Sequence, residues 1–334
     1  MTHKLSILDL APVGEGQTSS EVLQNSVTLA QRAEALGYTR VWFAEHHGMP
    51  SIASSSPELL MAHVASATRT IRVGSGGIML PNHVPLKVAE SFHTLEALYP
   101  GRVDLGIGRA PGTDQTTVRA LRSFDPSKFA EQLQELMLLS SGGFPPEHPF
   151  ASIRVMPGDV DLPPIWLLGS SGASAKFAGQ QGLGYSFASH FSQTPAGPAL
   201  AAYRDNFVPS ERFPKPHVIL AVSVVCAETD AEADFLASTG DLMQVNLRRG
   251  QFVPLTPPEE ASKREYSAFE RSIIEDGRRR NFVGSPETLR AKLGAFAKDN
   301  QADELMVTTI LHSPEARLRS YELLAEAMEI EAPA

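Results

Sequence analysis

The sequence predicts a single domain with an α/β fold, a (β/α)8 TIM barrel, over residues 1–334. Strand and helix signals alternate from the start of the chain to its end, which favours parallel strands joined by right-handed crossovers. Eight strand-like segments can be counted. Segments such as Val218–Cys226 are apolar throughout and therefore suit strands that are buried on both faces. A length of 334 residues fits one barrel with insertions.

Each expected strand is a short apolar run that ends in a turn signal. A two-domain doubly wound fold is the main alternative, but it would carry a glycine fingerprint after the first strand, and this chain has Asp9-Leu-Ala-Pro12 there. The expected strands are Lys4–Leu10, Thr39–Ala44, Ile71–Leu80, Arg102–Ile107, Pro163–Leu168, Gly184–Ala188, Val218–Cys226 and Glu304–Thr309.

The expected helices begin at recognisable caps. Thr18 and Glu21 have the spacing of a capping box, and the helix that they open ends at Leu36-Gly37. A Ser-Pro-Glu triplet combines a serine cap, a proline in the first turn and an acid near the positive helix end, and it occurs at 56–58, 285–287 and 313–315. Further helices are expected over Leu86–Leu98, Gln115–Leu139, a short stretch from Gly172, and Arg317–Met328.

Two segments do not fit the repeating unit, and we interpret them as insertions at the C-terminal face of the strands. Ser141–Asp161 is rich in proline and glycine and is expected to be a long loop. Asp241–Phe282 is rich in arginine and glutamate and is expected to be an excursion over the barrel mouth. Both segments are expected to shape the substrate pocket, and neither carries a motif that identifies the substrate.

Composition narrows the choice of partners. The net charge of −9 argues against nucleic acid or an anionic membrane as the main partner. No apolar run approaches the ~18 residues of a membrane span. The first residues lack the features of a signal peptide, and Cys226 is the only cysteine, so we expect a cytoplasmic protein.

The carboxyl ends of the strands are where the chemistry of a barrel of this class is expected. The second strand ends in Glu45-His46-His47. Adjacent strand residues point to opposite faces, so the two histidines have different tasks, and either of them could instead pack or satisfy a backbone group. A metal site needs several converging ligands, and the other histidines are scattered along the chain.

The third strand ends in Gly74-Ser75-Gly76-Gly77. Glycine weakens a strand, so three glycines in four residues indicate a bulge that helps the barrel to curve, a flat ring lying against bare backbone, or both. The strand after it leads to Arg109, where a cation can meet an anionic ligand, although an ordinary surface ion pair remains an alternative. Pro111 stands where a dinucleotide loop would need glycine, so that motif is rejected.

The fifth expected strand ends in a turn of small residues before a helix. Gly169, Ser170, Ser171 and Ser174 can present free amides and hydroxyls beside the positive helix end, which binds phosphate well. A plain Gly/Ser turn is the simpler alternative. The strand after it ends at His190, which places another histidine near the same mouth, for packing or for a ligand.

Three stretches together resemble the luciferase-like monooxygenases: WFAEHHG, then ASATRTIRVGSGGIMLPNHVPLKVAESFHTLEALYPGRVDLGIGRAPG, then PIWLLGSSGASAKFAGQQGLGYSFASHF. The resemblance implies a (β/α)8 barrel, FMN and a homodimer. It makes His46 the catalytic residue, and it implies a cis peptide at Gly76–Gly77 beside the flavin ring. The cofactor-binding residues would be Ser75, Gly76, Gly77, Arg109, Gly169, Ser170, Ser171, Ser174 and His190, with Arg109 and the serines on the phosphate.

The activity that this resemblance implies is FMN-dependent oxygenation of a small organic substrate. Reduced FMN from a separate flavin reductase would react with O2 to give a C4a-peroxyflavin, and His46 would handle protons. Bacterial luciferase has a reactive cysteine where this chain has Gly108, so the departure argues against light emission. Three alternatives remain open: a deazaflavin-dependent hydride-transfer enzyme, a non-catalytic flavin-binding protein and a metal-dependent barrel hydrolase.

Overall fold

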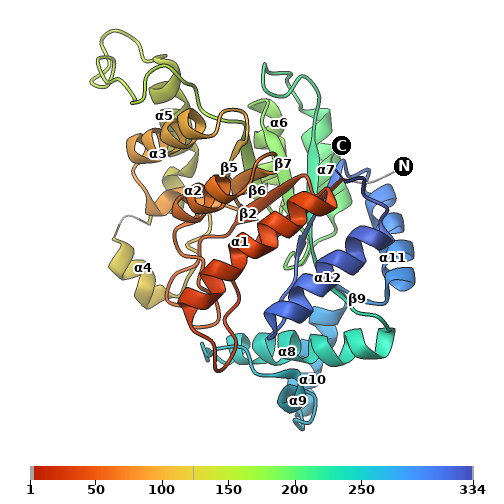
Figure 1. Cartoon of the computed structure of the whole chain (residues 1–334). Helices are drawn as coiled ribbons and strands as arrows, with labels where there is room; N and C mark the ends of the chain where they lie inside the picture. The colour runs from red at the N-terminus through yellow and green to blue at the C-terminus, as the bar shows by residue number, and fades with distance from the viewer. Residues whose placement is uncertain (1–3, 123, 333–334) are drawn as a thin grey trace.

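A computed structural model, which describes residues 4–122 and 124–332, shows eight parallel strands closed into a barrel (Figure 1). The strand order is β1-β2-β3-β5-β6-β7-β8, and β10 pairs with both β8 and β1 to close the circle. The predicted fold class is therefore confirmed. The barrel strands are β1 (Lys4–Asp9), β2 (Arg40–Phe43), β3 (Arg72–Ser75), β5 (Val103–Gly108), β6 (Ile165–Gly169), β7 (Gly184–Ala188), β8 (Val218–Cys226) and β10 (Glu304–Thr308).

Helices surround the barrel, and none of them within the described residues is long and apolar enough to cross a membrane. The capping box at Thr18 and Glu21 and the serine caps at Ser285 and Ser313 are present, whereas the Ser56 side chain makes no capping bond. The helices are α1 (Ser19–Leu36), α2 (Pro57–Ala67), α3 (Pro85–Leu98), α4 (Gln115–Leu121), α5 (Phe129–Ser141), α6 (Gly172–Gln180), α7 (Ala196–Asp205), α8 (Asp230–Arg248), α9 (Pro258–Ala261), α10 (Ala268–Arg278), α11 (Pro286–Asp299) and α12 (Pro314–Ala327).

The lumen of the barrel is filled by side chains. The Trp42 and Trp166 rings meet edge to face, with centroids 5.7 Å apart, and small and aliphatic residues pack around them. Further from the mouth, the buried Arg40 guanidinium contacts both Asp104 and Glu304 at 2.8 Å. The lumen cluster consists of Leu8, Trp42, Ala44, Trp166, Phe213, Ile219, Ala221 and Met306.

The prediction of one continuous strand over Ile71–Leu80 was wrong. β3 ends at Ser75, the Gly76–Gly77 peptide is cis, and the chain resumes as β4 (Ile78–Met79) and a 3-10 turn over Leu80–Asn82. A side chain at Gly77 would place its Cβ 2.7 Å from the Gly106 carbonyl oxygen of β5, so the two backbones are too close for any residue but glycine.

The prediction of one helix over Gln115–Leu139 was also wrong, because this stretch holds both α4 and α5. α4 ends at Leu121, and its C-cap residue Arg122 is in the left-handed region. Asp125 then caps a short 3-10 turn that starts at Pro126, and a proline disfavours helix in the residue before it. Ser123, which the predicted helix included, lies outside the described residues, as do residues 1–3 and 333–334 of the predicted domain.

The elements that the sequence analysis missed include α7, α8 and β9. α7 carries Gly197 and Pro198 in its first turn, which obscures its helical pattern. A short strand, β9 (Asn281–Gly284), lies at the end of the predicted excursion and pairs with the C-terminal half of β8. The helix α8 also crosses the expected start of that excursion, so the excursion consists mainly of helices α8, α9 and α10.

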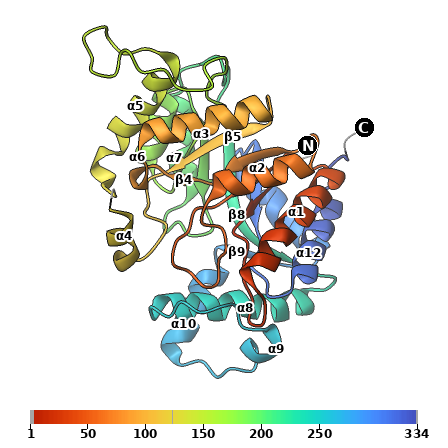
Figure 2. The same cartoon turned by 60° about the vertical axis from the view of Figure 1, so that its left-hand side comes forward.

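The loop over Ser141–Asp161 is not at the mouth, which corrects the prediction that it shapes the pocket. It joins the end of α5 to the start of β6, so it lies at the N-terminal face of the barrel. Figures 1 and 2 both show it at the end of the molecule opposite to α8, α9 and α10. The His93 ring pins it to α3 through a 2.9 Å contact between Nδ1 and the Pro157 carbonyl oxygen.

The excursion between β8 and β10 does reach the mouth. The loop after β1 donates from Val13 N to the Ser51 carbonyl oxygen at 2.9 Å, which ties it to the loop after β2. On its other side Leu255 exchanges two backbone hydrogen bonds with Val13 and Glu15, at 2.9 and 2.8 Å. Three segments that are distant in sequence therefore meet where the strands end.

Candidate functional site at the barrel mouth

Glu45 is a buried carboxylate that joins three segments of the mouth. It lies two residues beyond β2, and its oxygens lie 2.9 Å from His47 Nε2 and 2.9 Å from His83 Nε2. The Met79 amide and the Asn82 side-chain amide also donate to it, at 2.8 and 3.1 Å. Burial alone would raise its pKa, but the hydrogen bonds from His47, His83 and Met79 lower the pKa of Glu45 to about 2.

His46 follows Glu45 and is held by its backbone and by its ring. Its N–H donates to the Ser54 carbonyl oxygen at 3.0 Å, and its Nδ1 lies 3.2 Å from the Gly112 carbonyl oxygen. Because a carbonyl oxygen can only accept, Nδ1 carries the proton, and Nε2 of the neutral ring is an acceptor. Burial lowers the pKa of His46, so the neutral form prevails near pH 7.

His190 has the same arrangement on the other side of the mouth. It lies just beyond β7, and its Nδ1 is 3.2 Å from the Ala221 carbonyl oxygen, so its Nε2 is also an acceptor. Burial, opposed by the hydrogen bond to Ala221 and aided by the charge interaction with His46, lowers the pKa of His190 to about 4. The two histidines therefore lie within electrostatic reach of each other, and both rings are neutral.

The glycines at the end of β3 are required by the packing of the protein itself. A Cβ at Gly74 would lie 2.4 Å from the Trp42 ring, and one at Gly76 would lie 2.5 Å from Leu8. The Ser75 hydroxyl is buried and donates to the Gly106 carbonyl oxygen at 2.8 Å, which links β3 to β5. What this segment can offer a ligand is therefore backbone, because the one hydroxyl in it is already used.

Arg109 is an exposed cation that follows β5 directly. Among the described residues its side chain has no hydrogen-bond or ion-pair partner, so the alternative of a surface ion pair within this chain does not hold. Ile107 of β5 pairs with Leu167 of β6, and Arg109 and Gly169 each lie two residues further along the chain. The cation and the small-residue turn after β6 are therefore neighbours, as the sequence predicts.

That turn leads into an uncapped helix. Ser171 is the N-cap of α6, but its side chain makes no capping bond, so the first amides of the helix are not satisfied by it. The Ser174 hydroxyl donates to the Ser171 carbonyl oxygen at 2.9 Å and lies 3.1 Å from the Tyr185 hydroxyl. Ser170 offers its carbonyl oxygen to Ser192 and Thr194 at 3.4 Å, while its own hydroxyl is not used within the described chain.

The side chains of His83 and Asn82 were not among the predicted site residues. Asn82 ends the short 3-10 turn after β4 and His83 follows it, and both side chains reach back to Glu45, which lies 37 and 38 positions away in the sequence. The expected strand ends at Leu80-Pro81, and two polar residues follow at once. That pattern is the sequence signal that could have pointed to Asn82 and His83. Gly108, the position of the luciferase cysteine, faces Met79, whose sulfur would lie 2.8 Å from an added Cβ.

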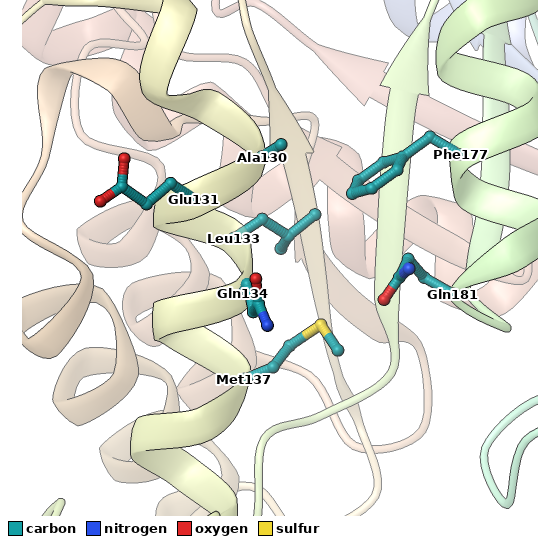
Figure 3. Close-up of a pocket in the computed structure, with 7 residues that line it drawn as sticks. All are labelled: Ala130, Glu131, Leu133, Gln134, Met137, Phe177 and Gln181. Carbon is teal, nitrogen blue, oxygen red and sulfur yellow. The ribbon is translucent and has the colours of Figure 1, made fainter. Parts of the chain in front are cut away.

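Two cavities lie away from these residues. One, of about 330 Å³, lies on the outer layer between α5 and α6, where Leu133 and Met137 stand across from Phe177 and Gln181 (Figure 3). The other, of about 390 Å³, lies among α8, α9 and α10. Neither contains a residue that the sequence assigned to the site. In the described part of the chain no group of three His, Cys, Asp or Glu side chains is placed to hold a metal ion.

Comparisons with known proteins show which family the chain belongs to. The chain is 41% identical over 331 residues to a luciferase-like monooxygenase of Escherichia coli, which covers 98% of both chains. It is 35% identical over 330 residues to the N-acetyl-S-alkylcysteine monooxygenase of Bacillus subtilis, covering 97% of this chain and 98% of that protein. The solved structure of apo-MsnO8 is 40% identical, covers 99% of both chains and superposes with a TM-score of 0.89. The profile of the luciferase-like monooxygenase family matches residues 3–302, and the chain belongs to this family.

Proposed function

We propose that this protein is an FMN-dependent monooxygenase that uses reduced flavin and O2 to oxygenate a small organic substrate. The observation that carries the proposal is that Arg109, which has no partner among the described residues, lies beside the N-terminus of α6, where Ser171 makes no capping bond. A free cation and unsatisfied helix amides on neighbouring strand ends suit a dianionic phosphate such as that of FMN. Reduced FMN supplies the activation of O2, and the protein binds, orients and shields the reactants.

The chain contributes three elements to this reaction. The two glycines Gly76 and Gly77 offer backbone without side chains to the flavin ring. His46 presents an unprotonated Nε2, which can accept a proton from a hydroxyl group at the mouth and return it. Glu45 holds the segment around His46 in place, because it binds His47 on one side and Met79 of β4 and His83 on the other.

Partners and substrate belong to the same proposal. We expect a homodimer in the cytoplasm that receives reduced FMN from a separate flavin reductase. An N-acetyl-S-alkylcysteine is the first substrate to assay, because a relative that is 35% identical over almost the whole chain is named for it. Light emission is not expected, since Gly108 has no thiol.

The deciding experiment is a pair of titrations followed by rapid mixing. The purified protein is titrated with FMN and, separately, with a deazaflavin cofactor. The protein with reduced FMN is then mixed with O2. We expect tight binding of FMN and a delay between O2 uptake and the return of oxidised-flavin absorbance. Preference for the deazaflavin would favour the hydride-transfer alternative, and FMN binding without any such delay would favour a non-catalytic flavin protein.

A further inference from the structure

Two hydroxyls face the barrel lumen side by side. Ser223 of β8 and Thr308 of β10 are direct partners in the parallel register. Ala221 and Met306 precede them by two residues each and belong to the lumen cluster. Since alternate strand residues point to the same face, Ser223 and Thr308 also face the lumen, one step nearer the mouth.

Thr308 has an unusual environment for a threonine. Its side-chain oxygen is buried and has no hydrogen-bond partner among the described residues, and the residue is only 5% exposed. Most buried polar groups are paired, because leaving one unpaired costs free energy. Its neighbour Thr309 points the other way and donates to the Val224 carbonyl oxygen at 2.8 Å. The hydroxyl of Thr308 is therefore available to a group that enters the lumen.

Ser223, the partner of Thr308 in the sheet, is less buried than Thr308. It is the one residue of β8 that is not buried, and its hydroxyl makes no hydrogen bond within the described chain. His190 lies beside the same stretch, with its Nδ1 on the Ala221 carbonyl oxygen. Two hydroxyl donors thus stand next to a neutral imidazole acceptor on one wall of the barrel.

This wall lies opposite the cis peptide. Going round the barrel from β3, the strands β5, β6 and β7 come before β8, which puts β8 halfway round the circle. A flavin ring bound against Gly76–Gly77 would turn its other face toward β8 and β10. An organic substrate bound between that ring and the two hydroxyls would be placed to receive oxygen.

We propose that Ser223 and Thr308 form the polar subsite for the organic substrate, in which both hydroxyls donate to one neutral carbonyl oxygen of a ketone or amide. The inference rests on the proposed function and names the substrate class of the same site. Two uncharged donors suit a neutral carbonyl better than a carboxylate, which would call for a cation. A matching compound that lacks the oxygen leaves both hydroxyls unpaired and is rejected for that reason.

The test uses FMN-loaded protein and matched compounds: cyclohexanone with methylenecyclohexane, and acetanilide with N-ethylaniline. Binding is followed through the absorbance of the bound FMN. The wild type is expected to prefer at least one carbonyl compound over its analogue by about tenfold. Thr308→Val and Ser223→Ala should each remove most of that preference while FMN affinity stays within about twofold. Thr309→Val is the matched control and should keep the preference.

Melting of the flavin-free variants provides an independent readout. Thr308→Val removes an unpaired hydroxyl, so its melting temperature should equal or exceed that of the wild type, whereas Thr309→Val loses a formed bond and should melt a few degrees lower. Equal losses in the two variants would overturn the subsite, and so would a wild type that binds FMN but prefers neither carbonyl compound. A wild type that does not bind FMN would overturn the proposed function as well.

Discussion

Nε2 of His83 lies 2.9 Å from Oε2 of Glu45, so a carboxylate at the end of one strand is tied to a loop 38 residues away. The same carboxylate binds His47, and His46 stands between the two. Glu45, which is 1% exposed, thus fixes the chain around His46, the residue that we propose as the proton carrier.

The Glu45–His83 contact predicts a pH-dependent stability. The pKa of Glu45, about 2, lies below its ordinary 4.5, so the carboxylate stabilises the fold fully above pH 4.5 and loses this effect as the pH falls toward 2. Burial lowers the pKa of His83, but the Glu45 carboxylate raises it more, so the net pKa lies above 6.5. The stability that charged His83 gains from Glu45 is therefore complete below pH 6.5 and is lost as the pH rises above it. Glu45→Gln should therefore cost most between about pH 4.5 and 6.5.

Urea unfolding of Glu45→Gln and the wild type at pH 3, 5.5 and 8 measures this difference. The exposed Glu326→Gln is the control and should show little change at any of the three values, since exposed ion pairs contribute little. A stability difference that is the same at all three pH values would mean that the charge of Glu45 does not contribute to the stability of the protein.

A second prediction concerns the buried ion pairs of Arg40 at the end of the lumen away from the mouth. Arg40 is 5% exposed and contacts Asp104 and Glu304, both fully buried. Arg40→Met removes the cation that the two buried carboxylates share and leaves Asp104 with Arg72 and Glu304 with His217, so it should lower the free energy of unfolding by about 3–5 kcal/mol. Arg319→Met removes an exposed ion pair with Glu228 and should cost at most about 1 kcal/mol. Similar losses in the two variants, measured by urea unfolding, would contradict the assignment.

The third prediction separates the packing role of Gly77 from any role in binding. An added Cβ would meet the Gly106 carbonyl oxygen at 2.7 Å, so Gly77→Ala should destabilise the flavin-free protein by about 1–3 kcal/mol. Gly294 in α11 has no atom within 4 Å of an added Cβ, so Gly294→Ala should stabilise by about 0.5–1 kcal/mol. If Gly77→Ala melts like the wild type without FMN, the close approach of the strands is not what requires glycine.

Local patterns were enough to predict the barrel, because each strand signal depends on neighbouring residues. The apolar run at Val218–Cys226 became β8 with the same bounds. The loop over Ser141–Asp161 follows an expected helix and precedes an expected strand, so the order of elements already places it at the N-terminal face, and its expected role at the pocket contradicted that order. Contacts such as Glu45–His83 and Ser223–Thr308 join distant segments, and no local signal marks them.

The fourth prediction tests the phosphate site. Arg109 has no partner in the described chain, so Arg109→Ala should leave stability nearly unchanged. A charge-assisted contact is worth roughly 1.5–3 kcal/mol, so FMN affinity should fall by about one to two decades. Riboflavin, which lacks the phosphate, should bind the variant and the wild type alike. Equal losses for both ligands in a fluorescence titration would remove the phosphate assignment.

The last prediction concerns His46 itself. Its Nδ1 is held by the Gly112 carbonyl oxygen at 3.2 Å, which leaves Nε2 free to take a proton. If His46 carries protons, His46→Ala should slow the chemical step by about 10²–10⁴-fold, while FMN affinity and melting temperature change little. Burial lowers the pKa of His46, so the rate of the wild type should fall as the pH drops and the ring becomes charged, and the variant should lack this dependence.

The competing view is that His46 only satisfies the Gly112 carbonyl oxygen and packs at the mouth. In that case His46→Ala would melt several degrees lower, because a buried acceptor loses its donor, and turnover per folded molecule would stay near that of the wild type. His46→Asn separates the two views further, since an amide can still donate to Gly112 but cannot carry a proton near neutral pH. Recovery of stability without recovery of rate in this variant supports proton transfer. Recovery of both would leave His46 a purely structural residue.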